Sequence, residues 1–244
     1  MPPHKLKLSS GEVHIWACRL SHHSTSIDLF DSMLSSAERA KANGLRFKRH
    51  RERFIIGHGF LRQTLATYFD IPPCKIDFAT LPGGKPRLVW RDRALAIEFS
   101  YSHSHDLALL AVSRDFRVGA DVEYIREEFD FEPVVGWLLG DARTDLRGIG
   151  RPRNSHAFYQ WWTQLEAIAK LNGHGIASLV DHGVDPSADW LNGISKCRVA
   201  GNDPCSICDV PGLDGYAASV AVSGVEYRTQ YWQPGVVDKG RRAA

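Results

Sequence analysis

The stretch Val118-Gly119-Ala120-Asp121-Val122-Glu123 decides how this chain of 244 residues is interpreted. Its apolar residues alternate with Asp121 and Glu123, which predicts a strand with one buried face. Alternate residues of a strand share a face, so the two carboxylates can point at the same spot. The simple alternative is a strand whose acidic face is exposed to solvent.

A second block, Trp162-Thr163-Gln164-Leu165-Glu166-Ala167-Ile168-Ala169-Lys170, predicts a helix about forty residues further along the chain. Glu166 and Lys170 are one turn apart on that helix and share a face. Three carboxylates that can converge with a lysine look like a hard-cation site beside a phosphate. The two blocks therefore suggest phosphoryl chemistry on a Mg²⁺-bound substrate, and an ordinary helix-surface pair of Glu166 with Lys170 is the alternative.

The composition is that of an ordinary globular protein. The formal net charge of +2 is too small to argue for bulk nucleic-acid binding, although basic residues crowd between Arg39 and Arg53. Without an apolar signal segment or a run long enough to cross a bilayer, we expect a cytoplasmic protein with no membrane contact. Five cysteines favour reduced thiols, and we interpret Cys205 and Cys208 as ordinary loop thiols rather than zinc ligands.

Local signals predict the elements of the first half. We expect a strand over Glu12–Leu20, and a helix that a capping box at Ser35–Glu38 opens and Gly44 ends. A longer helix should run over Lys48–Phe69 until Ile71-Pro72-Pro73 stops it. Three further strands are expected in this half: Leu88–Trp90, Ile97–Ser102 and Ala108–Ser113.

The second half should begin with a strand over Val118–Tyr124 that pairs with the preceding one through the turn Arg114–Arg117. After it we expect a surface connection (Asp141–Ser155), a helix (His156–Asn172), a strand (Tyr216–Val222) and a frayed tail (Gln233–Ala244). Helices and strands mix without regular βαβ alternation, which favours the α+β class. The chain divides into two such halves, residues 1–116 and 117–244.

Four blocks, in this order, resemble the 4′-phosphopantetheinyl transferases of the surfactin-synthetase-activating type. They are Gly84-Lys85-Pro86, Phe99-Ser100-Tyr101-Ser102-His103-Ser104, Val118–Glu123 and Trp162–Lys170, and Ser36–Arg62 is also similar to the family's N-terminal region. The resemblance implies a pseudo-dimer of two α+β halves with coenzyme A in the cleft between them. It also implies transfer of the phosphopantetheine arm of coenzyme A to a serine of an acyl or peptidyl carrier protein, with release of adenosine 3′,5′-bisphosphate.

The resemblance implies a role for each matching residue. Asp121, Glu123 and Glu166 would bind Mg²⁺, or Mn²⁺, and Glu166 could instead accept the serine proton. Lys170 would face the same phosphates and stabilise the leaving group. The remaining implied contacts are all with coenzyme A: Ser102 and His103 with its phosphates, Lys85 near the adenine nucleotide, and Lys41 and Arg53 near the 3′-phosphate.

Two positions depart from the family pattern. Leu165 stands where many relatives have lysine, so we expect one positive charge fewer near the phosphates. His105 stands where the family often has glycine, so the loop should differ in shape. The segment Glu127–Phe131 could contact the carrier or belong to the core, and the sequence leaves both open.

The family pattern, with both halves in one chain, implies a monomer and a carrier of secondary metabolism or a broad range of carriers. The sequence does not reveal whether the carrier belongs to a fatty-acid, polyketide or nonribosomal-peptide pathway. Three alternatives remain at this point. They are a relative that binds coenzyme A with weak or no transfer, another Mg²⁺-dependent phosphotransferase, and a basic nucleic-acid-binding module.

Overall fold

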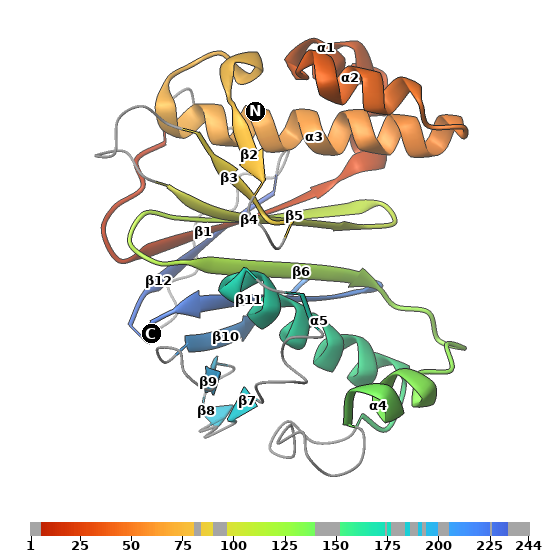
Figure 1. The fold of residues 1–244 in the computed structure, drawn as a ribbon, viewed down its shortest axis with the longest axis vertical. Helices are drawn as coiled ribbons and strands as arrows, with labels where there is room; N and C mark the ends of the chain where they lie inside the picture. Colours follow the sequence, from red (N-terminus) through yellow and green to blue (C-terminus); the bar gives the residue numbers. More distant parts are fainter. Residues whose placement is uncertain are drawn as a thin grey trace.

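The computed structural model describes residues 6–80, 84–89, 97–139, 152–173, 175–176, 184–185, 190–191, 194–199, 205–224 and 226–233. Figure 1 shows four layers, in which a helical layer, two β-sheets and a second helical layer follow one another. The long helix α3 (Lys48–Phe69) covers the first sheet, and α5 (Ser155–Asn172) covers the second. This arrangement confirms the predicted α+β class.

The first sheet and its helices come mainly from the first half of the chain. The strand order is β12-β1-β5-β4. The strands are β1 (Glu12–Arg19), β4 (Glu98–Ser104), β5 (Leu107–Ser113) and β12 (Arg228–Trp232). Around them lie 3₁₀ turns at Leu20–Ser26 and Pro73–Lys75, the helices α1 (Ile27–Met33) and α2 (Ser36–Asn43), and a small sheet of β2 (Phe78–Thr80) and β3 (Pro86–Leu88).

The second sheet follows the order β6-β11-β10-β9-β7, with β8 paired to β9. Its strands are β6 (Val118–Tyr124), β7 (Val184–Asp185), β8 (Trp190–Leu191), β9 (Ile194–Val199), β10 (Cys205–Asp209) and β11 (Tyr216–Ser223). The short helix α4 (Glu132–Leu139) precedes α5. Across the described ranges, every helix is too short or too polar to span a bilayer.

The predicted elements are largely present. The helix over Lys48–Phe69 and the strand over Val118–Tyr124 are confirmed at both ends, and the other predicted strands and helices that can be compared shift by one or two residues. The strand expected over Leu88–Trp90 is instead β3, Pro86–Leu88. Cys205 and Cys208 lie buried on strand β10 and not on a loop. Most of the predicted connection Asp141–Ser155 and of the predicted tail lies outside the described residues.

The predicted pairing of β6 with β5 is wrong. β6 pairs antiparallel with β11, with Asp121 opposite Ser219, while β5 lies between β1 and β4. The segment Arg114–Arg117 therefore leads from one sheet to the other instead of closing a hairpin. β5 is buried along its whole length. Its backbone hydrogen-bonding groups are paired on both edges because β5 lies in the interior of the first sheet, between β1 and β4.

Sheet membership also departs from the predicted division at residue 116. Strand β12 pairs in parallel with β1, in a register that sets Ile15 opposite Tyr231 and Trp16 opposite Trp232. The two tryptophan rings stack with centroids 5.1 Å apart. The last described strand therefore completes the first sheet.

The two sheets pack face to face through an apolar cluster. From the first sheet it takes Val13, Ile15 and Ala17, and from the second Val118, Ala120 and Val122, among others. All three apolar residues of β6 are fully buried, as the alternating pattern predicts. Their burial directs Asp121 and Glu123 to the other face of the strand, which α5 covers.

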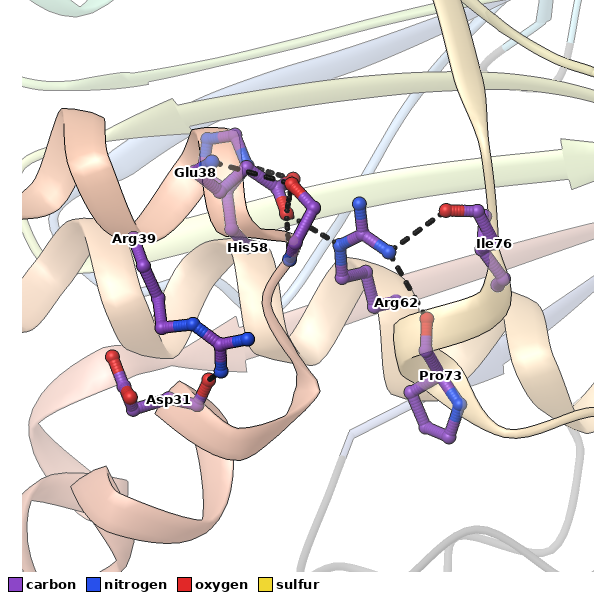
Figure 2. A network of polar contacts seen from close by, with 8 residues as sticks. Asp31, Glu38, Arg39, His58, Arg62, Pro73 and Ile76 are labelled. Atoms are coloured by element: carbon purple, nitrogen blue, oxygen red, sulfur yellow. Dashed lines mark hydrogen bonds and ion pairs between the residues drawn. The ribbon is translucent and has the colours of Figure 1, made fainter.

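The predicted capping box forms and is part of a larger polar network, shown in Figure 2. The Glu38 carboxylate accepts hydrogen bonds from the Ser35 backbone at 2.8 Å, from Arg62 Nε at 2.6 Å and from His58 Nδ1 at 3.1 Å. Arg62 is buried, and it also donates to the carbonyl of Ile76 at 2.8 Å. The network thus joins α2, α3 and the segment after Pro73.

This network predicts how stability depends on pH. Burial alone would raise the pKa of Glu38, but the bonds from His58, Ser35 and Arg62 outweigh it and lower the pKa from 4.5 to about 2. A lowered folded-state pKa stabilises the fold above pH 4.5, and this contribution disappears as the pH falls towards 2. The lowered pKa of Glu38 contributes about 3 kcal/mol to the free energy of unfolding above pH 4.5.

We expect Glu38→Gln to be less stable than the wild type by about 3 kcal/mol at neutral pH, with the gap closing between about pH 4.5 and 2. Denaturant unfolding over a pH series measures this difference. The control is Glu52→Gln, which removes a more exposed carboxylate that pairs with Lys48 at 3.6 Å and should change stability by less than about 0.5 kcal/mol. Parallel curves for the wild type and Glu38→Gln would contradict the prediction.

Candidate active site

Helix α5 lies directly against strand β6 because residue 119 is glycine. A Cβ atom at Gly119 would stand 2.5 Å from the backbone nitrogen of Leu171 and would also collide with the carbonyl oxygen of Ala167. The strand and the helix backbone are therefore as close as a residue without a side chain allows. Asp121, two residues further along the same strand face, meets the side of α5 that carries Lys170.

Asp121 is the centre of the site. Its Oδ1 accepts hydrogen bonds from Lys170 Nζ at 2.6 Å and from Ser102 Oγ at 2.8 Å, and Lys170 Nζ lies 3.1 Å from Ser102 Oγ. The side chain of Asp121 is 4% exposed and that of Lys170 is 29% exposed, so solvent reaches the lysine but hardly reaches the acid. Among the described residues Lys170 thus pairs across elements with Asp121, and not along its helix with Glu166.

A row of serines on β4 links the two sheets beside this site. Ser100 Oγ accepts from the backbone nitrogen of Ala120 at 2.9 Å. Ser104 Oγ donates to Glu123 Oε2 at 2.6 Å and accepts from the backbone nitrogen of Tyr124 at 3.1 Å. With Ser102 they form an alternating row that faces β6. Our sequence analysis overlooked Ser100 and Ser104, although the spacing of serines at every second position was a visible signal.

The three predicted metal ligands influence one another electrostatically. Burial raises the pKa of Glu166, and the Asp121 charge raises it further. Burial also raises the pKa of Glu123, with added repulsion from Asp121 and Glu166. Burial raises the pKa of Asp121 against the opposing effects of Lys170 and Ser102. The group as a whole has more negative charge than Lys170 balances, and an added cation would stabilise it.

One oxygen of this group lacks a partner among the residues that the structure describes. Asp121 Oδ2 is fully buried and accepts no hydrogen bond from any of them. A buried carboxylate oxygen left unpaired is costly, and a hard cation is the ligand that such an oxygen suits best. Within the described part of the chain, no group of three acidic, histidine or cysteine side chains is placed so that it could hold a metal ion. Mg²⁺ does not need one, because it usually binds one or two carboxylates together with waters and substrate phosphates.

The predicted coenzyme A ligands fall into two groups, of which the first surrounds His103. The pKa of its imidazole is lowered by partial burial and then by the charges of His58, Lys170 and Lys41. His103 stacks on Tyr101 with centroids 5.8 Å apart, and Lys41 Nζ lies 5.4 Å from the centre of the Phe54 ring. Lys41 of α2, His58 of α3 and Lys170 of α5 therefore all approach His103 on β4.

Lys85 and Arg53 lie apart from this group. Lys85 Nζ donates to the carbonyl of Val118 at 2.7 Å, and burial lowers the pKa of Lys85. Arg53 Nη2 lies 3.5 Å from His105 Nδ1, at the turn between β4 and β5. Lys85 therefore lies at the start of β6. Among the contacts of the described residues, neither Lys85 nor Arg53 touches Asp121.

The two departures from the family pattern have simple structural consequences. Leu165 is fully buried in the core between α5 and the second sheet, so a lysine there would have to leave the core to reach a phosphate. His105 adopts φ of 53°, the left-handed conformation that glycine favours, and stacks on Tyr124 with centroids 4.7 Å apart. The turn thus keeps a backbone conformation suited to glycine despite the histidine.

The aromatic residues of Glu127–Phe131 and the basic residues between Arg39 and Arg53 both make contacts within the protein. Phe129 and Phe131 are partly buried against Phe158, at 5.5 and 5.3 Å between ring centroids, so these aromatics pack with the core. In the basic segment, Arg39 donates to the carbonyl of Asp31 and Arg51 to that of Leu45. These internal bonds weaken the nucleic-acid alternative.

Comparison with known proteins identifies the family. No protein-family model matches the chain. The chain is 32% identical over 231 residues to the 4′-phosphopantetheinyl transferase HetI of Nostoc sp. strain PCC 7120, a match that covers 94% of this chain and 95% of the relative. It is 29% identical over 151 residues to the 4′-phosphopantetheinyl transferase psf-1 of Bacillus pumilus, covering 62% and 63% of the two chains. The chain therefore belongs to the 4′-phosphopantetheinyl transferase family.

A putative 4′-phosphopantetheinyl transferase of Synechocystis sp. is 27% identical over 164 residues, which cover 67% of this chain and 65% of the relative. A solved holo-(acyl-carrier-protein) synthase from Bacillus anthracis, in complex with CoA (3′,5′-ADP), aligns with 41% of this chain and 91% of its own at 22% identity. Its TM-score of 0.32 is too low to add to the assignment. The sequence relatives confirm the predicted enzyme class, a 4′-phosphopantetheinyl transferase or holo-carrier-protein synthase.

The contact between β6 and α5 can be tested by adding one methyl group. We expect Gly119→Ala to lower the free energy of unfolding by about 1–3 kcal/mol or more, because the new Cβ meets helix backbone that cannot move independently. Phosphopantetheinyl transfer should fall as well, since the added methyl group would displace Lys170 relative to Asp121. Chemical denaturation and a transfer assay on the folded variant measure the two effects.

Gly136→Ala is the matched control, because a Cβ at Gly136 of α4 would meet nothing within 4 Å. Removing a helical glycine there should stabilise the protein by about 0.5–1 kcal/mol. Equal stability and activity in Gly119→Ala and the wild type would show that β6 and α5 are not in the close contact described.

Proposed function

We propose that this transferase moves the 4′-phosphopantetheine arm of coenzyme A to a serine hydroxyl of an apo carrier protein. The serine oxygen forms a new bond to the β-phosphorus, the bond from that phosphorus to the bridging oxygen breaks, and adenosine 3′,5′-bisphosphate leaves. The serine proton passes to a base of the enzyme or to water. The observation that carries this proposal is Asp121, a buried carboxylate held by Lys170 and Ser102 with one oxygen unpartnered.

Asp121, Glu123 and Glu166 would hold the divalent cation, with Mg²⁺ as the expected ion. Their raised pKa values and the unpartnered Asp121 Oδ2 support this assignment. When bound, the ion neutralises charge on the diphosphate and on the leaving oxygen. Ser102 and Ser104 then act on the acids, because their hydroxyls orient Asp121 and Glu123 by donating to them.

Lys170 supplies positive charge for the transferring phosphoryl group. Its ammonium group is partly open to solvent and is fixed by Asp121 and Ser102. A preorganised cation of this kind stabilises a transition state without having to reorganise during the reaction. The three donor protons of an ammonium group allow it to contact a phosphate oxygen while keeping these two bonds.

Glu166 has the properties of a general base. Burial and the neighbouring Asp121 charge raise its pKa, which makes it a stronger proton acceptor than an ordinary glutamate. A bound cation would instead keep the Glu166 carboxylate ionised and lower its affinity for a proton. The role of Glu166 as a base and its role as a metal ligand therefore require opposite changes in its proton affinity. We assign the proton-accepting role to Glu166 when the carrier serine is bound, and its share in cation binding to the state before that.

The remaining predicted residues would bind the nucleotide end of coenzyme A. Lys41 and His103 support this role because they belong to one cationic group that includes Lys170. Arg53 supplies a further cation at the β4–β5 turn, and Lys85 lies at the start of β6. An acidic carrier protein is the expected partner, since exposed basic residues of α3 would speed its approach.

Asp121→Asn tests the site with almost no change in shape. We expect phosphopantetheinyl transfer to fall by about a hundred-fold or more, as when one electrostatic contact to a transition state is removed. Stability should change by about 1 kcal/mol or less, because the buried negative charge is also removed. The readout is the mass gain of an apo carrier protein incubated with coenzyme A and Mg²⁺, and calorimetric titration of Mg²⁺ in the presence of coenzyme A should show weaker binding.

Asp130→Asn is the control, because Asp130 is an exposed carboxylate of the same half and should leave transfer unchanged. Retained transfer in Asp121→Asn would refute the assigned site. A wild-type protein that binds coenzyme A but modifies no carrier of any pathway would favour the weakly active alternative.

A further inference from the structure

A contiguous row of side chains connects helix α2 with strand β4 on the side of the site away from Asp121. Lys41 Nζ lies 5.4 Å from the centre of the Phe54 ring, and His58 stacks on the same ring at 4.0 Å. His58 approaches Tyr101 at 6.1 Å, and Tyr101 stacks on His103 at 5.8 Å. Every member of the row is thus in ring contact with the next.

The ionisable groups of this row are nearly all cationic or able to become so. Lys41 on α2, His58 on α3 and Lys170 on α5 all lie close enough to His103 to lower its pKa. The acid in contact with the row is Glu38, whose carboxylate already accepts bonds from Ser35 and Arg62. Lys170 is already paired with Asp121, but the described contacts of Lys41 include no ion pair with an acid, so an anionic ligand would be favoured beside Lys41.

The Glu38 contact determines what His58 can offer to a ligand. With its pKa lowered to about 2, Glu38 is ionised near neutral pH and can only accept hydrogen bonds. His58 must therefore donate from Nδ1, at 3.1 Å from Glu38 Oε1. The other ring nitrogen, Nε2, becomes a donor only when the imidazole is protonated. The side chain of His58 is 24% exposed, so a ligand can reach it.

We propose that His58, oriented by Glu38, donates a hydrogen bond from Nε2 to the 3′-phosphate of coenzyme A and so favours coenzyme A over its dephospho form. This inference rests on the proposed function and adds a positioning and specificity residue that the family resemblance does not supply. A phosphate monoester suits the row because it is dianionic and the row has several cations. The diphosphate of coenzyme A would then lie beyond His103, beside Asp121, Glu123, Glu166 and the divalent cation that these acids would bind.

The test compares transfer from coenzyme A and from dephospho-coenzyme A, which differ only in the 3′-phosphate. His58→Asn is the informative variant, because the amide of asparagine can still donate to Glu38 while the Nε2 end of the ring is absent. We expect it to lower the ratio of kcat/KM for coenzyme A to kcat/KM for dephospho-coenzyme A about ten-fold. His58→Lys should restore a high ratio, because its ammonium group can again donate to the 3′-phosphate.

His50→Asn is the matched control, because it changes an exposed histidine of the same helix. It should leave the ratio unchanged. The same ratio in His58→Asn as in the wild type would overturn the proposal, even if the wild-type protein transfers phosphopantetheine normally.

A binding experiment keeps this proposal separate from the transfer reaction. Calorimetry with adenosine 3′,5′-bisphosphate and with adenosine 5′-phosphate measures the contribution of the 3′-phosphate without any carrier protein. A ten-fold loss of the difference in His58→Asn supports the His58 contact, and an undiminished difference refutes it. Failure of the wild type to modify any carrier would refute the proposed function and leave this second result to decide on His58.

Discussion

The close approach of helix α5 to strand β6 at Gly119 is the constraint on which the candidate active site depends. Because no side chain separates the two backbones, Lys170 reaches Asp121 and Ser102 with hydrogen bonds of 2.6 and 3.1 Å. A bulkier residue at position 119 would move the helix outward by roughly the width of a methyl group, and hydrogen bonds of this length do not survive such a shift. The packing of α5 against β6 thus positions the site, and the hydrogen bonds of Lys170 form only while that packing is maintained.

The junction between the two sheets has a different chemistry at its centre and at this edge. At the centre, apolar side chains such as Ile15 and Val220 exclude water and hold the sheets together. At the edge, hydroxyls of Ser100, Ser102 and Ser104 bridge β4 and β6. An apolar centre provides the stability that lets the edge remain polar, and a polar edge is where a charged substrate can be bound without burying unpaired groups.

Features that neighbouring residues determine could be predicted from the sequence, and features that depend on packing could not. The capping box at Ser35 and the helix Lys48–Phe69 are confirmed, because neighbouring residues determine them. The partner of β6 was predicted wrongly, since the period of a strand fixes which face is buried but not which strand lies beside it. The contact of Asp121 with Lys170 agrees with one part of the expected convergence, and the convergence of the three carboxylates on a cation stays a prediction. The Glu38, His58 and Arg62 network was not predicted, because its members come together only after the helices pack.

The parallel pairing of β12 with β1 has a consequence for biosynthesis. A ribosome makes residues 12–19 long before residues 228–232, yet these two segments are neighbours in one sheet. During translation one hydrogen-bonding edge of β1 therefore stays unsatisfied while all the residues between the two strands are made. An open strand edge of this kind is a template for association with other nascent chains. We therefore expect this protein to depend on chaperone protection during synthesis.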